Sequence, residues 1–167
     1  MQIAQASIAE DGTKNGKKLG NQKKELNIVN YYGAWQYAIR FKRLDVAHNL
    51  ALIAIAAVNN KMIGYSQLHR NTLWKYARAC LSVGNIRTPC ACDCSSLAAV
   101  CANLAYYSIF KKWLIDYNGN LPTTRNIVKK LLATGAVTII EKPLKEELKI
   151  GDILVNEGKH TIILVKE

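Results

Sequence analysis

The sequence predicts an α+β fold from three observations. Apolar residues follow helical spacing in four segments, 45–59, 66–82, 94–105 and 123–133. After Gly135 the period changes to short β-branched runs separated by turns. Half of the 167 residues are hydrophobic and 21% are charged, a composition typical of a globular domain with a sizeable core. We therefore expect helices in the first two thirds, packed on a small antiparallel sheet formed by the C-terminal third.

The helical segments have recognisable ends. Asp45 favours the amino end of the first helix, and Gly84 ends the second, which begins at Ser66 or Gln67. Residues 85–93 contain Pro89 and are expected to form a loop. A buried helix rich in small residues then begins at or beside Cys94.

A last helix and three strands complete the expected elements. Thr123 or Thr124 can cap the helix that runs to Ala133, before Gly135. The β-branched runs predict strands at 136–140, 152–155 and 161–165.

The chain length fits one domain, residues 1–167, in three parts. Residues 1–43 form a basic N-terminal region, in which the Gly- and Lys-rich stretch 12–24 is an expected exposed loop. Residues 44–135 form the helical part, and residues 136–167 form the sheet.

The chain is strongly basic, with 23 Lys and Arg against 12 Asp and Glu, for a net charge of +11. Such a charge favours a polyanionic partner, which could be nucleic acid, an anionic membrane face or an anionic wall polymer. The N-terminus lacks a basic start and a long apolar run, so no secretory signal is visible. The longest apolar stretch, 50–58, has about half the length of a membrane-spanning helix. We expect a soluble protein made in the cytoplasm, without membrane insertion.

Five cysteines are crowded into one part of the chain, at positions 80, 90, 92, 94 and 101. A disulfide framework would spread them out, so the crowding favours local thiol chemistry or a metal. The alternation at 90, 92 and 94 matches zinc poorly, because structural zinc sites prefer two to four residues between paired cysteines. We therefore expect no metal or cofactor, with zinc as the alternative.

Cys94 and His160 are the candidate nucleophile and general base. A thiol at a helix amino terminus faces backbone N–H groups, which lower its pKa and can also stabilise an oxyanion. His160 follows a Gly-containing turn and begins an otherwise apolar strand, which can hold an imidazole rigidly. His48 and His69 are expected on helix faces.

These motifs resemble the NlpC-type cell-wall cysteine peptidases. The matching residues are Asp-Cys-Ser-Ser-Leu at 93–97, Gly-Asp-Ile-Leu at 151–154, and His160 at a strand start. The stretches 6–8, 63–67, 70–73 and 89–94 resemble the catalytic module of certain endolysins from phages of Gram-positive bacteria. The resemblance implies a papain-like fold of the NlpC/CHAP type.

The resemblance also implies roles for individual residues. Cys94 would attack an amide carbonyl, and His160 would take the thiol proton and return it to the leaving amine. A third polar residue should orient the imidazole from the strand after the histidine strand, but the chain ends at Glu167 before such a strand.

Five further side chains are candidates around this pair. Gln22 or Gln67 could orient the imidazole, or donate to the oxyanion, if the orienting group comes from elsewhere in the chain. Tyr65, Gln67 and Ser95 could line a substrate cleft. Asp93 could do so too, although its expected role is to accept backbone N–H bonds at the helix start.

The implied function is that of a peptidoglycan hydrolase, an endolysin-type cysteine peptidase or amidase. Its partners would be bacterial peptidoglycan and anionic wall polymers, reached after release from the host cytoplasm. The end at Glu167 suggests a domain cut from a longer protein with a C-terminal wall-binding module. The bond cleaved is left open.

The alternative function is a non-catalytic, basic nucleic-acid-binding domain with a cysteine cluster. The lysines of 14–24 and the aromatic residues of 31–37, near Arg40 and Arg43, would suit phosphate and stacking contacts. The sequence carries none of the familiar nucleic-acid-binding motifs, so the resemblance to wall peptidases is preferred.

Overall fold

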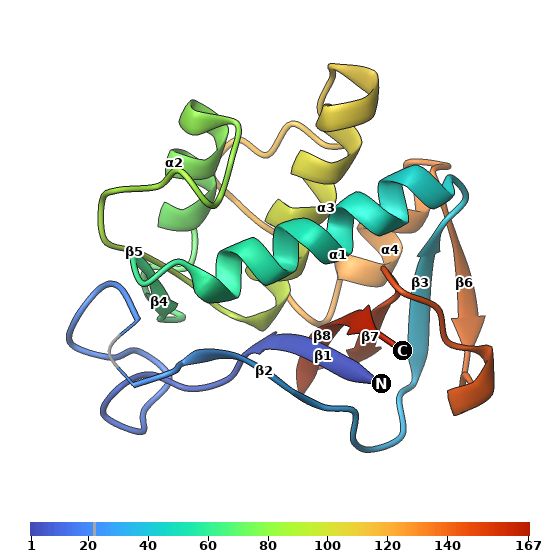
Figure 1. Ribbon diagram of the computed structural model, residues 1–167, viewed down its shortest axis with the longest axis horizontal. Helices are drawn as coiled ribbons and strands as arrows, with labels where there is room; N and C mark the ends of the chain where they lie inside the picture. Colours follow the sequence, from blue (N-terminus) through green and yellow to red (C-terminus); the bar gives the residue numbers. More distant parts are fainter. Residues whose placement is uncertain (22) are drawn as a thin grey trace.

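A six-stranded antiparallel sheet and a layer of helices on one of its faces make up the fold (Figure 1). The computed structural model describes residues 1–21 and 23–167. The strands are β1 Gln2–Ala6, β2 Leu26–Asn30, β3 Tyr37–Phe41, β4 Ile63–Tyr65, β5 Cys90–Cys92, β6 Val137–Glu141, β7 Ile153–Asn156 and β8 His160–Lys166. The helices are α1 Leu44–Asn59, α2 Thr72–Cys80, α3 Cys94–Phe110, α4 Ile127–Leu132 and a 3-10 turn at Lys145–Glu147.

Both ends of the chain contribute to the main sheet, whose order is β2-β1-β8-β7-β3-β6. The expectation that the C-terminal third forms the sheet is therefore wrong, because β1, β2 and β3 come from residues 1–43. Strands β1, β2 and β3 carry polar residues such as Gln5, Asn27 and Arg40, which weaken their apolar pattern. Their partners lie far away in sequence: β1 pairs with β8, and β3 with β6 and β7.

A second, two-stranded sheet lies beside the main one. Strands β4 and β5 pair in parallel, from Ile63↔Cys90 to Tyr65↔Cys92. The prediction of a continuous loop over 85–93 is wrong at its end, because β5 follows Pro89 directly and its three residues are buried. Because β5 ends at Cys92, its pairing with β4 positions the start of α3 at Cys94.

The long helices agree with the sequence pattern, and the short ones begin later than expected. Helix α1 begins at Leu44, and α3 begins at Cys94. Helix α2 begins at Thr72 rather than near Ser66, because the buried Ser66 hydroxyl accepts from the His69 N–H and holds a turn there. Helix α4 begins at Ile127, after a turn in which the Asn126 side chain accepts from the Thr123 N–H.

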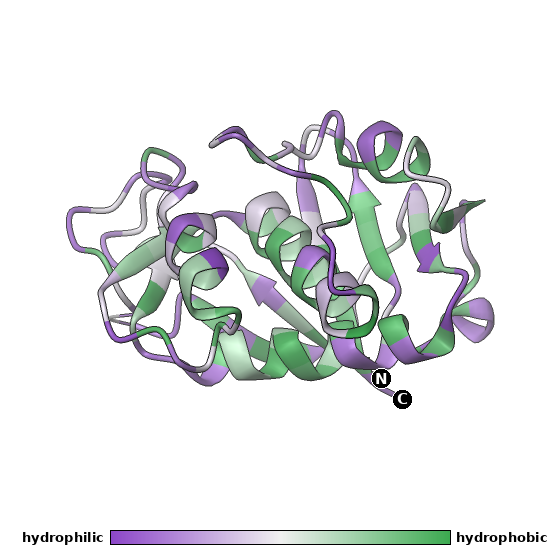
Figure 2. Cartoon of the chain, turned by 90° about the horizontal axis from the view of Figure 1, so that it is seen from above, coloured by the Kyte–Doolittle hydropathy of each residue, from purple (hydrophilic) through white to green (hydrophobic). Residues whose placement is uncertain are grey.

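The sheet has apolar residues on both faces. Ala4, Ile39 and Ile163 belong to the larger core beneath α1 and α3, whereas Ile3 and Leu164 belong to a smaller cluster on the opposite face. Because side chains alternate along a strand, neighbouring residues of β1 and β8 serve different clusters. Figure 2 shows hydrophobic colouring along α1 and α3, with hydrophilic segments at both ends of the molecule. Within the described residues, no helix is both long and apolar enough to cross a membrane.

The Gly-Asp pair before β7 fixes α1 to the sheet. Gly151 has a positive φ of +86°, and a Cβ there would lie 2.2 Å from the carbonyl oxygen of Ala47 in α1. Asp152 is buried and binds the Arg40 guanidinium through both carboxylate oxygens, at 2.9 and 2.6 Å. The pair therefore holds the layers together, and it lies outside the pocket described below.

Candidate functional site

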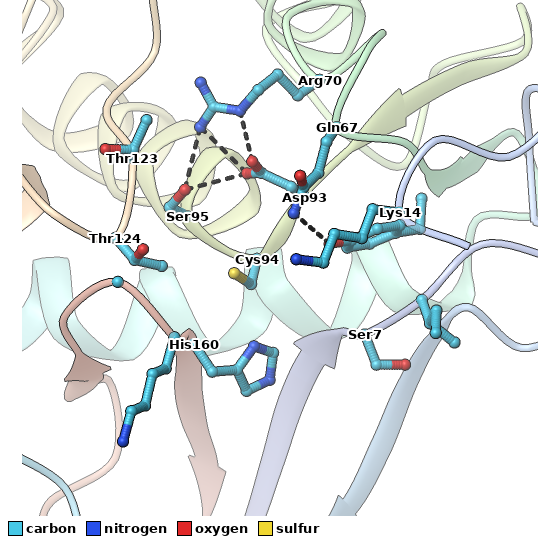
Figure 3. A pocket seen from close by; sticks show the side chains of 14 residues that line it. Ser7, Lys14, Gln67, Arg70, Asp93, Cys94, Ser95, Thr123, Thr124 and His160 are labelled. Carbon is cyan, nitrogen blue, oxygen red and sulfur yellow. Dashed lines mark hydrogen bonds and ion pairs between the residues drawn. The ribbon is translucent and has the colours of Figure 1, made fainter. Parts of the chain in front are cut away.

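A pocket lies where α3 begins, where β8 begins, and where the loop after β1 passes them (Figure 3). Cys94 and His160, the predicted nucleophile and base, both line it. The predicted side chains Tyr65, Gln67, Asp93 and Ser95 line it as well. Gln22 lies outside the described residues.

Cys94 is the first residue of α3. The turn before it is fixed by a capping box in which the Asp93 carboxylate accepts from the Ser96 N–H, at 2.8 Å, and the Ser96 hydroxyl accepts from the Asp93 N–H, also at 2.8 Å. This capping role is the one that the sequence indicated for Asp93. The arrangement fixes the position of the sulfur at the floor of the pocket.

The Cys94 thiol has its pKa raised to about 11, contrary to the expected lowering. Burial is the main cause, since the residue is only 8% exposed, and the Asp93 charge adds to it. Hydrogen bonds from the backbone at Thr161, Ser95 and Cys94 act in the opposite direction but are weaker. Free Cys94 is therefore a thiol at neutral pH.

His160 is oriented by Gln5, a residue that the sequence analysis missed. Its Nε2 lies 3.1 Å from the Gln5 Oε1 across the β1–β8 pair. Gln5 is itself held, because its Nε2 donates to Asn27 Oδ1 at 3.0 Å and its Oε1 accepts from the Tyr32 hydroxyl at 2.7 Å. The expected third polar residue thus comes from the first strand of the chain.

The hydrogen bonds around Gln5 also assign the imidazole tautomer. The Gln5 Oε1 can only accept, so His160 Nε2 must carry the proton in the neutral ring. Nδ1 then keeps a lone pair and can accept a proton. Burial lowers the pKa of His160, which favours this neutral ring.

Trp35 covers the imidazole on the sheet face opposite the helices. The two ring centroids are 6.2 Å apart, and Trp35 is only 4% exposed. The Trp35 Nε1 donates to the Tyr32 carbonyl at 3.0 Å, so the same short segment supports both the ring and Gln5. This cover restricts the imidazole to few orientations.

Arg70 joins three segments beside the start of α3. Its guanidinium binds the Asp93 carboxylate from Nε at 2.5 Å and from Nη2 at 3.1 Å, and it donates to the Ser95 hydroxyl at 3.0 Å. It also donates to the carbonyl oxygens of Leu121 and Pro122. Because the Arg70 guanidinium binds both side chains, Asp93 and Ser95 have structural roles here.

Tyr65 and Gln67 form a second polar group beside the sulfur. The Gln67 Nε2 donates to the Tyr65 hydroxyl at 3.2 Å, which leaves the hydroxyl proton free to donate elsewhere. Burial raises the pKa of Tyr65 to about 12, so the hydroxyl keeps its proton. Tyr65 and Cys94 line the same pocket.

The other histidines and cysteines lie away from the pocket lining. His48 and His69 are exposed, on α1 and just before α2. Cys90 and Cys92 are buried in β5 and Cys101 in α3, and burial raises the pKa of all three thiols. In residues 1–21 and 23–167, no three His, Cys, Asp or Glu side chains are grouped so that they could hold a metal ion.

Comparisons with known proteins gave one finding. A family model described as an endolysin-like domain matches residues 3–167. The searches of curated proteins and of solved structures found no significant match.

Proposed function

Because the chain belongs to the endolysin-like domain family, whose description indicates cell-wall lysis, we propose that it is a peptidoglycan hydrolase with a Cys94–His160 mechanism. The observation that carries the proposal is the shared pocket of a helix-capping thiol and a histidine oriented by Gln5. A substrate amide in this pocket would meet a nucleophile, a base and hydrogen-bond donors together.

The first half of the reaction transfers the acyl group to sulfur. As Cys94 Sγ attacks the carbonyl carbon, its proton passes to Nδ1 of His160, where the lone pair is free. The imidazolium then gives that proton to the leaving nitrogen as the carbon–nitrogen bond breaks. A thioester and a free amine result.

The second half regenerates the enzyme. Water attacks the thioester while His160 Nδ1 takes one of its protons, and the sulfur leaves and recovers a proton from the imidazolium. Gln5 holds the ring in place throughout, because its oxygen accepts from Nε2–H in both the neutral and the charged form.

The tetrahedral oxyanion requires donors near the sulfur. The Cys94 N–H at the start of α3 and the free proton of the Tyr65 hydroxyl are the proposed pair. Tyr65 suits this role since its raised pKa keeps the proton on oxygen through the working pH range. Gln67 then acts as the residue that positions Tyr65.

The cysteine peptidase or amidase class and the papain-like fold belong to the same proposal. Support comes from the order of the parts: a nucleophile at the start of a buried helix and a base on a strand of an antiparallel sheet. We propose that the +11 charge favours the anionic wall over nucleic acid, and that the enzyme reaches the wall after release from the host cytoplasm.

The test is wall cleavage by the wild type and by Cys94→Ala and His160→Ala. Purified Gram-positive walls should lose turbidity and release new amino groups with the wild type, and neither variant should produce amino groups above background. Cys80→Ala is the matched control, because Cys80 is exposed at the end of α2 and away from the pocket lining. Release by Cys94→Ala at the wild-type rate would rule out the mechanism.

A further inference from the structure

The charged side chains around the pocket make it cationic. Those that line it are Lys14, Arg70, Asp93 and Lys159, besides His160, which burial keeps neutral. Arg70 and Asp93 neutralise one another through their ion pair. The two lysines are left without a balancing acid among the described lining residues, so the pocket favours a substrate with negative charge.

The Lys14 backbone is tied to the segment that carries Tyr65. Its carbonyl oxygen accepts from the Gln67 N–H at 2.8 Å, and the next carbonyl, of Asn15, accepts from the Ser66 hydroxyl at 2.6 Å. Both donors directly follow Tyr65 in the chain. The loop that carries Lys14 is thus fixed to the segment that carries the proposed oxyanion donor.

The loop is also ordered from within. One carboxylate oxygen of Glu10 accepts from the N–H groups of Lys17 and Lys18, at 2.7 and 3.0 Å. The Asp11 carboxylate accepts from the Thr13 N–H and hydroxyl, at 2.9 and 2.6 Å. These contacts use backbone groups and short side chains, and leave the lysine side chains for other partners.

The Lys14 side chain extends into the pocket towards Cys94 (Figure 3). Within the described part of the chain, its ammonium forms no ion pair. A cation that extends towards Cys94 from a fixed loop, without an ion-pair partner among the described residues, is suited to bind an anionic group of the substrate close to the reacting amide.

We infer that Lys14 forms a subsite for a free carboxylate of the wall peptide, next to the amide that Cys94 attacks. The inference rests on the proposed function and specifies its substrate class: peptides in which a carboxylate lies beside the scissile bond. Peptides in which that group is an amide, or in which an amine lies there, are poorer substrates because the ammonium gains no partner or meets a like charge.

The experiment compares two wall preparations. Purified walls freed of phosphate polymers are either left untreated or amidated at their carboxylates with carbodiimide and ammonia. Initial rates of amino-group release are measured for the wild type, Lys14→Gln and Lys17→Gln. Lys17 is the matched control, because it lies in the same loop, loses the same charge and is not among the residues that line the pocket. A general attraction between a basic protein and the wall therefore affects both variants equally.

We expect the wild type and Lys17→Gln to prefer untreated walls by about fivefold, the effect of one exposed ion pair. Lys14→Gln should lose this preference, and Lys14→Arg should keep it. Equal preference in Lys14→Gln and Lys17→Gln overturns the inference, as does a wild type that cleaves both walls equally well, and both outcomes leave the proposed function intact. A wild type that releases amino groups from neither wall contradicts the proposed function itself. Thermal unfolding midpoints of the variants show whether a lost preference reflects lost folding.

Discussion

The Gln5 side-chain oxygen lies 3.1 Å from Nε2 of His160, so a residue at the start of the chain orients an imidazole near its end. The two residues belong to neighbouring antiparallel strands, β1 and β8. Because Asn27 and Tyr32 fix the Gln5 amide, its oxygen is held towards the imidazole. The orienting contact thus comes from the first strand of the sheet, whereas the sequence resemblance implied one from a strand after the histidine strand.

Replacing Gln5 by Ala should lower kcat by about 10-fold to 100-fold with little change in KM, since an imidazole without its partner loses orientation and its assigned tautomer. The measurement is steady-state amino-group release from walls. Gln5→Glu adds a test that a purely structural role would not pass. A carboxylate at this point raises the pKa of His160 and moves the acid limb of the pH–rate profile to higher pH. Gln2→Glu, on the same strand but opposite Lys166 at the other end of β8 from His160, should leave that limb in place.

The wild-type pH–rate profile should show its acid limb below pH 6.5. Burial lowers the pKa of His160 beneath that value, so the ring loses its proton, and becomes a base, at a lower pH than a free imidazole does. Activity is therefore lost only as the pH falls through the lowered pKa. The measurement is kcat/KM on walls between pH 4.5 and 8, where about half-maximal activity at or above pH 6.5 would contradict the assignment.

How much of this site the sequence predicts depends on how local each feature is. Helices α1 and α3 and the position of Cys94 follow from apolar spacing and a capping residue within a few positions. Gln5 was missed because its partner is 155 residues away, and no local pattern marks that contact. Strand β1, Gln-Ile-Ala-Gln-Ala, does not alternate between polar and apolar residues, so its own pattern does not single out Gln5. Only the need for a further polar residue was visible in the sequence.

The pKa of Cys94 is a second property that the sequence alone does not predict. A helix start predicts a lowered pKa, and the backbone hydrogen bonds do act in that direction. The opposing effect of burial depends on how β8 and the loops close over the sulfur, which is a tertiary property. Asp93, whose role as a cap was predictable, also raises the pKa through its charge.

Alkylation of Cys94 by iodoacetamide should accelerate steadily as the pH rises from 7 to 10. Its pKa is raised to about 11, so the reactive thiolate fraction grows about tenfold per pH unit in that range. The rate is measured by mass spectrometry in a Cys80→Ser background, which removes the exposed competing thiol. Cys94→Ala in the same background gives the contribution of the three other buried thiols. A rate that is already constant at pH 7 would show a preformed thiolate and refute the neutral thiol.

Arg70→Met should reduce the free energy of unfolding by about 3–5 kcal/mol, because it leaves the Asp93 carboxylate buried without its cation. The side chains of this pair are only 14% and 10% exposed. Arg78→Met breaks the ion pair between Arg78 and Asp116. Because these two side chains are 42% and 58% exposed, the loss in the free energy of unfolding should be less than about 1 kcal/mol. Urea denaturation followed by circular dichroism measures both. Similar losses in the two variants would mean that the Arg70 contacts add little to the fold.

Gly151→Ala should reduce the free energy of unfolding by about 2–5 kcal/mol, through two separate costs. A side chain at φ +86° is strained by about 1–2 kcal/mol, and its Cβ would overlap the Ala47 carbonyl of α1, which adds about 1–3 kcal/mol. Gly135→Ala separates these costs, since Gly135 has φ +71° with nothing within 4 Å of the added atom. It should therefore show only the backbone cost. Equal losses in urea denaturation would mean that α1 can move away from β7, and that Gly151 serves its turn alone rather than the close approach of the helix to the sheet.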